Sequence, residues 1–507
     1  MFKNSRIKPA PKVVRTEQAP VAKKPQPLPS KIASSARRQQ QIARSNASSL
    51  RSSPAISNRS SPPTSPSEDH EPSSRHLQVP KRKPMRQSSP SDRPKFNESE
   101  DDEDDGASCQ QPAQKRQKVQ DKGGGKRQLR SRKAFSEADC GKFKMIHAAE
   151  IVATLRKPKA VADTSIEDVI VELQYPSASQ RERYDLHFGK DRIDSIEEII
   201  EIAKVVTKVY LTDEQAEPFL GQDNGKVIRE LEKARNTLGK EPTQSRREDF
   251  KKAVDGYNTA IQRLIQDGAL AKNLDSRYDL PLEMVQLILR QVYDRTVSPD
   301  VDSLRKYDAG SDNVYGELLS PLVNRIFVKT EITSDQVFVD LGSGVGNVVL
   351  QAALQVGCES WGCEMAPNAC KLAKAQKREF KARCRLWGIA TGEVHLVADD
   401  FTKNRPIQDA MKRADVILVN NEVFSSGLNH TLNLLFLDCK DDCKIVSLKS
   451  FVPEGHQITA RNKGNPANVL DVKKHQYYRG DVSWTDAGGD YYIATKDSQR
   501  LADFERQ

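Results

Sequence analysis

The stretch that decides the fold runs Val337-Phe338-Val339-Asp340-Leu341-Gly342-Ser343-Gly344-Val345-Gly346-Asn347. Its apolar, β-branched start predicts a buried strand, and its three glycines predict a tight turn. Residues 348–354, which are rich in Ala, Val and Leu, predict a helix directly after the turn. A strand, a glycine turn and a helix in this order are typical of the first unit of a doubly wound α/β sheet that binds a nucleotide-type cofactor.

The glycine spacing narrows the choice of cofactor. Gly342, Gly344 and Gly346 read G-x-G-x-G behind Asp340, whereas dinucleotide sites read G-x-G-x-x-G. The exposed N–H groups of such a turn suit a carboxylate as well as a phosphate. With Asp340 at a ligand's ammonium and Glu364, at the end of the next strand, at its ribose hydroxyls, these groups describe S-adenosyl-L-methionine. The glycine turn alone is weak evidence, because ordinary tight turns also use glycine.

Charge is distributed unevenly along the chain. Residues 1–133 hold 29 of the 80 Lys and Arg but only 13 of the 70 Asp and Glu, so the remainder is slightly acidic. Phe2 and Phe96 are the only aromatic residues in this segment, which therefore cannot bury enough apolar surface to offset its chain entropy. We expect residues 1–135 to form a disordered basic tail, rich in Ser and Pro.

Short basic clusters in the tail suggest its partners. Pro80-Lys81-Arg82-Lys83-Pro84 and Lys115-Arg116-Gln117-Lys118 are typical of nuclear-import signals, which predicts a nuclear protein. A flexible basic segment without aromatics can contact phosphates but cannot stack on bases, so residues 115–133 should bind DNA non-specifically. A merely solvating charge run is the alternative.

Several function classes are disfavoured by composition. No apolar run approaches the length of a membrane span, and the N-terminus lacks a secretory core, so we expect a soluble, intracellular protein with no membrane partner. The eight cysteines include no C-x-x-C pair and no His at ligand spacing. We therefore expect reduced thiols and no metal site.

Residues 143–310 have a helical pattern. Apolar residues recur at helical spacing over residues 193–209 and 250–265, and Asp279 before Leu280-Pro281 predicts the cap of a further helix. A short extended piece is expected near residues 169–171. We interpret this region as a helical lobe in front of the sheet, with its apolar stripes forming core.

Residues 311–496 alternate between strand and helix patterns and form the predicted cofactor-binding core. We expect strands at residues 337–341, 359–364, 393–398, 414–419 and 443–448, with a helix over 367–388. Antiparallel strands at residues 468–478, 481–484 and 491–495 would close the sheet.

Polar and aromatic residues fall where such a sheet binds its ligand. Asp400 and Phe401 follow the third of these strands, where they would meet the adenine amine and ring. Asn420 ends the fourth strand beside the topological switch point. Tyr315 and Glu317, just upstream of the glycine turn, could form a lid near the sulfonium and the amino group, although a plain loop is the alternative.

Six segments occur together in order, and their combination is specific. They are Val314-Tyr315-Gly316-Glu317, residues 339–347, Gly362-Cys363-Glu364, Asp400-Phe401, Val416-Ile417-Leu418-Val419-Asn420-Asn421 and Val482-Ser483-Trp484-Thr485 followed by Tyr491-Tyr492. Together they resemble the disruptor-of-telomeric-silencing histone methyltransferases, of the fungal type, over roughly residues 143–496.

The resemblance implies a seven-strand, Rossmann-like S-adenosyl-L-methionine methyltransferase fold rather than a SET domain. It also implies methylation of lysine-79 of histone H3 on nucleosomes, with roles in telomeric silencing and chromatin regulation. The cofactor-binding residues would be Tyr315, Gly316, Glu317, Asp340, Gly342, Gly344, Gly346, Asn347, Glu364, Asp400, Phe401 and Asn420.

The resemblance further implies a catalytic set of Asn420, Tyr315, Phe424, Tyr491 and Tyr492. Asn420 would lie near the methyl group, while Phe424 and one of Tyr491 or Tyr492 would wall a channel for the substrate lysine. One departure is Glu422, which stands where the family has an aromatic after its Asn pair.

A dry channel also explains how lysine could react without a dedicated base. Its ammonium has a pKa of about 10.4 in water, and desolvation lowers that value by several units. Three rival functions remain: a nucleic-acid methyltransferase, a non-catalytic chromatin-binding module and an NAD-dependent oxidoreductase. The first often has a proline-aromatic pair after its Asn, the second would lose the glycines or acids, and the third needs a different glycine spacing.

Overall fold

The computed structural model describes residues 127–136, 143–155, 169–186, 193–220, 226–305 and 316–506. The predictions for residues 1–126 and for Tyr315 lie outside the described residues. Within the described part of the chain, no helix combines the length and the apolar composition needed to cross a membrane.

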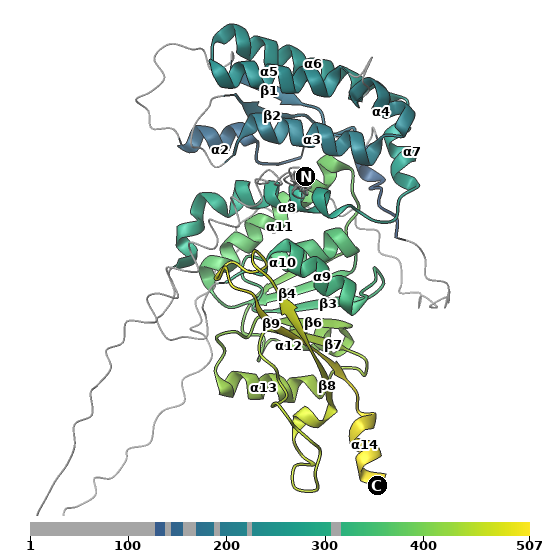
Figure 1. The fold of residues 1–507 in the computed structure, drawn as a ribbon, viewed down its shortest axis with the longest axis vertical. Coiled ribbons are helices and arrows are strands. Elements are labelled where there is room, and N and C mark those ends of the chain that lie inside the picture. The colour runs from purple at the N-terminus through teal and green to yellow at the C-terminus, as the bar shows by residue number, and fades with distance from the viewer. Residues whose placement is uncertain are drawn as a thin grey trace, which may run out of the picture. The chain divides into compact units, whose positions relative to one another are not determined.

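A seven-stranded sheet forms the centre of the fold (Figure 1). Its strands are β3 (Val337–Leu341), β4 (Glu359–Glu364), β5 (Val394–Ala398), β6 (Val416–Val419), β7 (Lys444–Ser447), β8 (Leu470–Tyr477) and β9 (Gly489–Lys496), in the order β5-β4-β3-β6-β7-β9-β8. All pairs are parallel except those of β9 with β7 and with β8. The chain reverses its direction of travel across the sheet between β3 and β6, so the predicted α/β fold with a switch point is confirmed.

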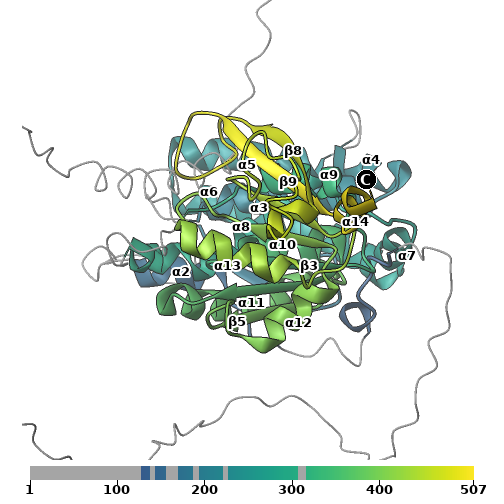
Figure 2. The same ribbon diagram turned by 90° about the horizontal axis from the view of Figure 1, so that it is seen from below.

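Helices cover both faces of this sheet (Figures 1 and 2). One face packs against α12 (Arg405–Arg413) and α13 (Ser426–Phe436), and the other against α9 (Ser320–Thr330) and α10 (Asn347–Gln351). Alternate residues of β3 supply the two cores: Val339 faces α12 and α13, and Phe338 faces α9. Burial on both faces explains why the parallel strands read as continuous apolar runs.

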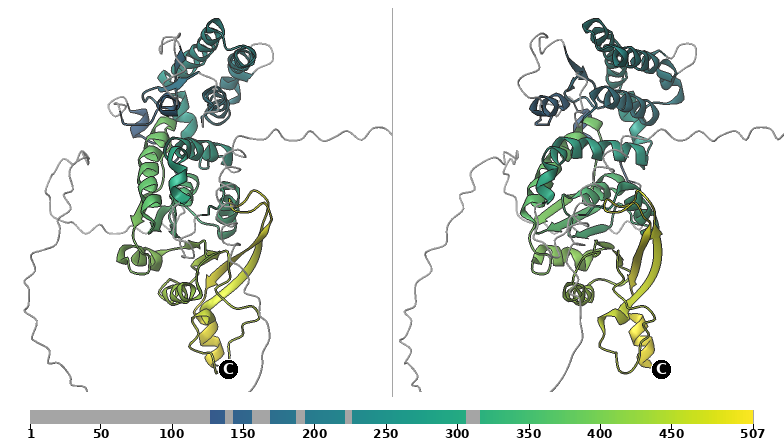
Figure 3. Two further views of the ribbon diagram at one scale, coloured as in Figure 1. Left: turned by 90° about the vertical axis from the view of Figure 1, so that its left-hand side faces the viewer. Right: turned by 60° about the vertical axis from the view of Figure 1, so that its left-hand side comes forward.

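The helical lobe contains most of the predicted elements. Its bounds are α2 (Ala148–Leu155), β1 (Ile170–Leu173), β2 (Glu182–Asp185), α3 (Ser195–Tyr210), α4 (Asp213–Leu220), α5 (Val227–Lys240), α6 (Gln244–Gln266), α7 (Ala269–Asp275), α8 (Leu282–Thr296) and η3 (Ser298–Arg305). Figure 3 shows α5 and α6 side by side, as in a hairpin of two antiparallel helices. The cap of α8 differs from the prediction, because Pro281, with an extended ψ of 138°, precedes the first helical residue in place of Asp279.

Two segments of the core also differ from their predictions. Residues 127–135 were assigned to the tail, yet Leu129 is fully buried and the Arg127 guanidinium donates to the Leu354, Gln355 and Ala390 carbonyl oxygens. Residues 481–484 were expected to join the sheet, but Val482 forms an isolated antiparallel bridge with Leu318. In both segments, long-range contacts that no local pattern shows determine the conformation.

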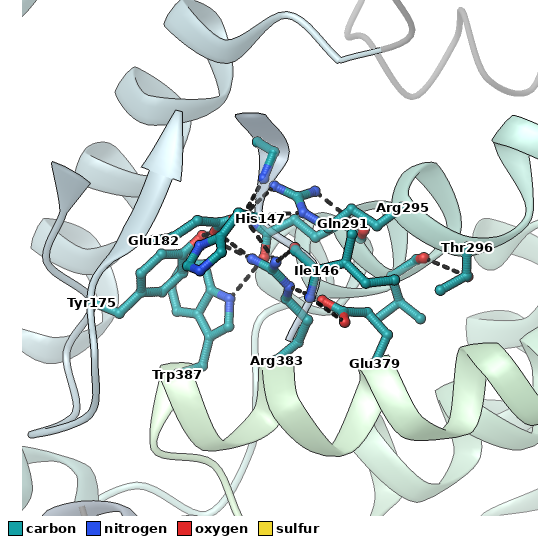
Figure 4. A network of polar contacts seen from close by, with 12 residues as sticks. Ile146, His147, Tyr175, Glu182, Gln291, Arg295, Thr296, Glu379, Arg383 and Trp387 are labelled. Carbon is teal, nitrogen blue, oxygen red and sulfur yellow. Dashed lines mark hydrogen bonds and ion pairs between the residues drawn. The ribbon is translucent and has the colours of Figure 1, made fainter. Parts of the chain in front are cut away.

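The lobe is joined to the core by buried ion pairs centred on Glu182 of β2 (Figure 4). Its Oε1 accepts from Arg295 Nη2 of α8 and from Arg383 Nη2 of α11 (Pro367–Trp387), each at 2.8 Å. Arg295 also pairs with Glu198 of α3, and Arg383 with Glu379. Burial alone would raise the pKa of Glu182, but the two guanidinium groups overcome it and hold that pKa well below its ordinary value.

Glu182→Gln should destabilise the protein by about 3–5 kcal/mol, because it leaves two buried arginines with too little negative charge. Urea denaturation followed by circular dichroism measures this loss. Glu283→Gln is the matched control, since it breaks an exposed pair with Lys208 and should cost less than about 1 kcal/mol. Equal effects of the two substitutions would contradict the structural role of the network.

Candidate functional site

A cavity of about 390 Å³ opens at the carboxyl edge of β3, β4 and β6. It is walled by the glycine turn, by the N-terminal end of α11 and by η3. Many of the residues predicted from the sequence line it: Gly316, Glu317, Asp340, Gly342, Gly344, Asn347, Glu364, Asp400, Phe401, Asn420 and Phe424. These residues come from five separated segments of the chain, which the parallel sheet brings to one edge.

The turn after β3 needs its glycines. Gly342, Gly344 and Gly346 have φ angles of 84°, 56° and 90°, in the left-handed region that residues with a Cβ rarely adopt. Gly346 does not line the cavity, but a Cβ there would lie 3.2 Å from Leu396 of β5. The spacing therefore shapes a turn whose backbone can approach a ligand closely.

Asp340 is the most unusual ionisable group of the cavity. It is 4% exposed, and burial, followed by the neighbouring charge of Glu364, raises the pKa of its carboxyl to about 8. No basic side chain of the described residues forms an ion pair with it. A ligand with a positive charge, such as the predicted ammonium, would favour the ionised form of Asp340.

Glu364 is held ready as a hydrogen-bond acceptor. Its Oε2 accepts from the Gly344 backbone N–H at 2.9 Å, and its Oε1 accepts from those of Met365 and Ala366 at 2.9 and 2.7 Å. Three backbone donors fix the carboxylate without a counter-charge. The group therefore fits the predicted role of binding ribose hydroxyls.

An aromatic wall closes the other end of the cavity. Phe401 and Phe424 are stacked with ring centroids 6.4 Å apart, and the Phe424 ring lies next to Gly342. Asp400 accepts from Lys403 Nζ at 2.8 Å and from the Thr402 hydroxyl at 2.6 Å, and first the Lys403 contact and then the Thr402 hydroxyl lower its pKa. An acid that stays ionised beside an apolar ring surface fits an adenine.

Glu317 is positioned by contacts that the sequence analysis missed. Its N–H donates to Ser483 Oγ at 2.8 Å, and its Oε1 accepts from Asn347 Nδ2 at 3.0 Å. Gln376 of α11 in turn donates to Asn347 Oδ1 at 2.9 Å. Asn420 lies beside them and donates to the Gly316 carbonyl oxygen at 3.1 Å. Ser483 belongs to a quoted motif, but nothing local marks it or Gln376 as a support.

The Trp484 ring packs against Gly316. A Cβ at Gly316 would lie 2.9 Å from that ring, so the loop can pass the tryptophan only with glycine there. Ser483 and Trp484 do not line the cavity, but they support its wall from behind through Glu317 and Gly316.

Tyr491 and Tyr492, which were predicted near the reacting groups, do not line this cavity, and neither does Glu422. Tyr491 of β9 is 1% exposed in the core beside α9, with its ring centroid 5.2 Å from that of His475. Tyr492, the next residue of β9, pairs with Ser447 of β7. Glu422 is half-buried outside the cavity lining, where burial raises its pKa. A role for either tyrosine in a substrate channel remains a prediction.

Side chains of the kinds that bind metal ions do not gather in the described part of the chain. Within the described ranges, no group of three or more His, Cys, Asp or Glu side chains could hold a metal ion. The cavity lining also includes no histidine. Its groups are suited to holding an organic ligand with positive charge.

Comparisons with known proteins agree with this geometry. A family model described as "Histone methylation protein DOT1" matches residues 293–496. A relative from Emericella nidulans is 49% identical over 75% of this chain and 75% of its own, and one from Gibberella zeae is 49% identical over 81% and 82%. Both are named "Histone-lysine N-methyltransferase, H3 lysine-79 specific".

Solved structures give only a distant likeness. An RNA methyltransferase from Salinibacter ruber, in complex with S-adenosyl-L-homocysteine, matches 36% of this chain and 94% of its own with 18% identity and a TM-score of 0.25.

Asp340→Asn should stabilise the free protein while abolishing its response to S-adenosyl-L-methionine. An ordinary pKa near 3.8 and a folded value of about 8 mean that the buried carboxyl increasingly destabilises the free protein as the pH rises between them. The amide should raise the melting temperature at pH 7.5 by roughly 2–4 °C. Thermal shift with and without the ligand measures both effects, and Asp409→Asn on the exposed face of α12 is the control.

The affinity for S-adenosyl-L-methionine should rise with pH up to about 8. Below that value Asp340 is protonated in the free protein, so binding a cation must release its proton, and affinity should change by at most about tenfold per pH unit. Titration calorimetry in two buffers of different ionisation enthalpy measures the released proton. Its persistence in Asp340→Asn would assign it to another group.

Proposed function

This chain belongs to the DOT1 family of histone methylation proteins, and we propose on that premise that it transfers methyl groups from S-adenosyl-L-methionine to lysine-79 of histone H3. The relatives described above are named for that specificity and align with most of the chain. The residues of the cavity fit both the donor and the kind of acceptor that this reaction requires.

The observation that carries the proposal is the buried acid at the glycine turn. Asp340 places a buried carboxyl at the glycine turn, where a dinucleotide would bring its pyrophosphate, and like charges in a buried site repel strongly. A ligand with an ammonium meets the opposite condition, because its positive charge offsets the acid. The cavity thus discriminates against NAD by charge as well as by glycine spacing.

Different residues of the cavity would bind different parts of S-adenosyl-L-methionine. Asp340 and Glu317 would receive the ammonium, the backbone of the glycine turn the carboxylate, and Glu364 the ribose. Asp400 and Phe401 would hold the adenine. When bound, S-adenosyl-L-methionine supplies a methyl group that the substrate nitrogen takes as the C–S electron pair returns to sulfur.

The protein's own task is to position a neutral amine and to exclude water. Phe401, Phe424 and Leu428 supply apolar surface to the cavity, and desolvation there favours the uncharged form of an entering lysine. No histidine lines the cavity to act as a base, so the proton would leave to solvent before the attack. Asn420, fixed to the Gly316 carbonyl oxygen, would define the place of the nucleophile.

We place this reaction in the nucleus and on the nucleosome. The basic clusters at residues 81–83 and 115–118 have the composition of nuclear-import signals, and residues 115–133 carry enough positive charge to hold DNA without reading its sequence. A substrate that contains both histone H3 and DNA would engage the cavity and the tail together.

Incubating the full-length protein with tritiated S-adenosyl-L-methionine and recombinant nucleosomes should label histone H3, and nucleosomes with arginine in place of H3 lysine-79 should stay unlabelled. Asn420→Ala should lower kcat/KM by roughly 100-fold, because the nucleophile loses its fixed position. Asn433→Ala, on α13 outside the cavity lining, should leave the rate unchanged. Label on nucleic acid, or on H3 that lacks the lysine, would reject the proposed substrate.

A further inference from the structure

A second hollow lies between α9 and β8, on the side of the sheet where β8 is the last strand. It is lined by Arg325 and Lys329 of α9 and by Lys474, His475, Gln476 and Tyr478 of β8 and its end. We call it the α9–β8 groove. It has a volume of about 470 Å³ and shares no lining residue with the cofactor cavity.

The sheet register explains why basic residues meet in the groove. In the β8–β9 pair, Lys473 lies opposite Ile493 and His475 opposite Tyr491, and these two β9 residues belong to the core beneath α9. Lys473 and His475 therefore face the same side as α9. Lys473 does not line the groove itself, but it and Lys329, which lies one helical turn beyond Arg325, both act electrostatically on His475 in the groove.

Positive charge in the groove exceeds the negative charge available to neutralise it. Arg325 pairs with Asp481, and Lys474 pairs with Asp490 at 2.8 Å. Lys329, Lys473 and Arg479 are exposed, and no acid in the described ranges lies within ion-pair distance of them. Burial, and after it Lys329 and Lys473, lowers the pKa of His475, as expected where the local potential is positive.

An exposed aromatic residue, Tyr478, follows the end of β8 and lines the groove. Tyr478 is 59% exposed, and the Arg325 guanidinium carbon lies 5.6 Å from its ring centroid. A tyrosine offers a hydroxyl donor and a flat face, both of which contact sugar and phosphate well. The groove thus combines lysines, an arginine and an aromatic on one accessible surface.

The shape of the groove favours a polymer over a small anion. A single anion needs convergent, buried donors, whereas the unpaired lysines here are solvent-exposed and the groove is open. Arg325 and Lys329 lie one turn, about 6 Å, apart on α9, and Lys473 adds a further charge from β8, so the positive charge is spread over separate positions. Such a spread of charge suits a polyanion, whose own charges are spread along a line.

We propose that the α9–β8 groove binds the phosphodiester backbone of DNA, with Lys329 and Lys473 at the phosphates and Tyr478 against the sugars. This inference rests on the proposed function, because nucleosomes bring DNA to the enzyme. It adds a contact on the folded core to the one expected of the basic tail. A contact from the folded core would fix the orientation of the cavity relative to the bound DNA.

Charge reversal in the full-length protein tests the groove with the tail still present. The Lys329→Glu/Lys473→Glu double variant is compared with Lys233→Glu/Lys240→Glu, which changes the same charge on exposed positions of α5 in the helical lobe. Fluorescence anisotropy with duplex DNA at several salt concentrations gives the affinity and its salt dependence. The groove variant should lose about two from the slope of log K against log salt, since each phosphate contact contributes about 0.9.

Both variants must keep the melting temperature and the S-adenosyl-L-methionine affinity of the unmodified protein. If the two glutamates unfold the protein, Lys329→Ala/Lys473→Ala should shift the slope of log K against log salt in the same direction. A groove variant that equals the α5 variant in DNA affinity and slope overturns the proposal. A variant that loses nucleosome methylation but keeps its affinity for free DNA also overturns it, in favour of an acidic protein surface. Because DNA binding is measured without methyl transfer, failure of the proposed activity would leave this test intact.

Discussion

The cofactor cavity depends on the buried ion pairs around Glu182. Glu182 binds both Arg295 of α8 and Arg383 of α11, and each of these helices is connected to the cavity wall. The chain leaves α8 into η3, whose Ser303 and Leu304 line the cavity, and α11 begins at its wall with Pro367. A network that fixes these two helices therefore also fixes two walls of the site. Removing three charges from water is costly, and only their mutual pairing makes the arrangement stable.

The buried acid of the cavity, Asp340, differs from Glu182 in having no ion-pair partner among the described residues. At Glu182 the protein neutralises its own acid, whereas at Asp340 it buries an acid and supplies no ion-pair partner from the described residues. The first arrangement is complete without a ligand and gives stability. The second is completed by a cationic ligand and gives specificity, since the free energy lost in burying Asp340 returns when the cation binds.

The sequence predicts this fold well where local chemistry decides the structure. The glycine turn, the strand bounds from β3 to β7 and the helix over residues 367–387 follow from apolar runs and from turn residues. The glycines of the turn have the positive φ angles that such a turn requires. Residues 127–135 could not be assigned in this way, because their partners lie more than 200 residues away: Arg127 donates to the Leu354 and Gln355 carbonyl oxygens, and the Leu129 carbonyl oxygen accepts from the Ala390 N–H. The same holds for Tyr491: its strand is readable, but its burial under α9 depends on the order of the last two strands.

Residues 481–484 show why such long-range contacts matter for function. Asp481 pairs with Arg325 in the α9–β8 groove, and its carbonyl oxygen accepts from the Leu319 N–H at 2.8 Å. Two residues later, Ser483 Oγ accepts from the Glu317 N–H in the cavity wall. A segment that alternation assigns to the sheet thus connects the basic groove to Glu317, which lines the cavity. Since both contacts lie within one short, hydrogen-bonded stretch, the orientation of α9 and the position of Glu317 are set together.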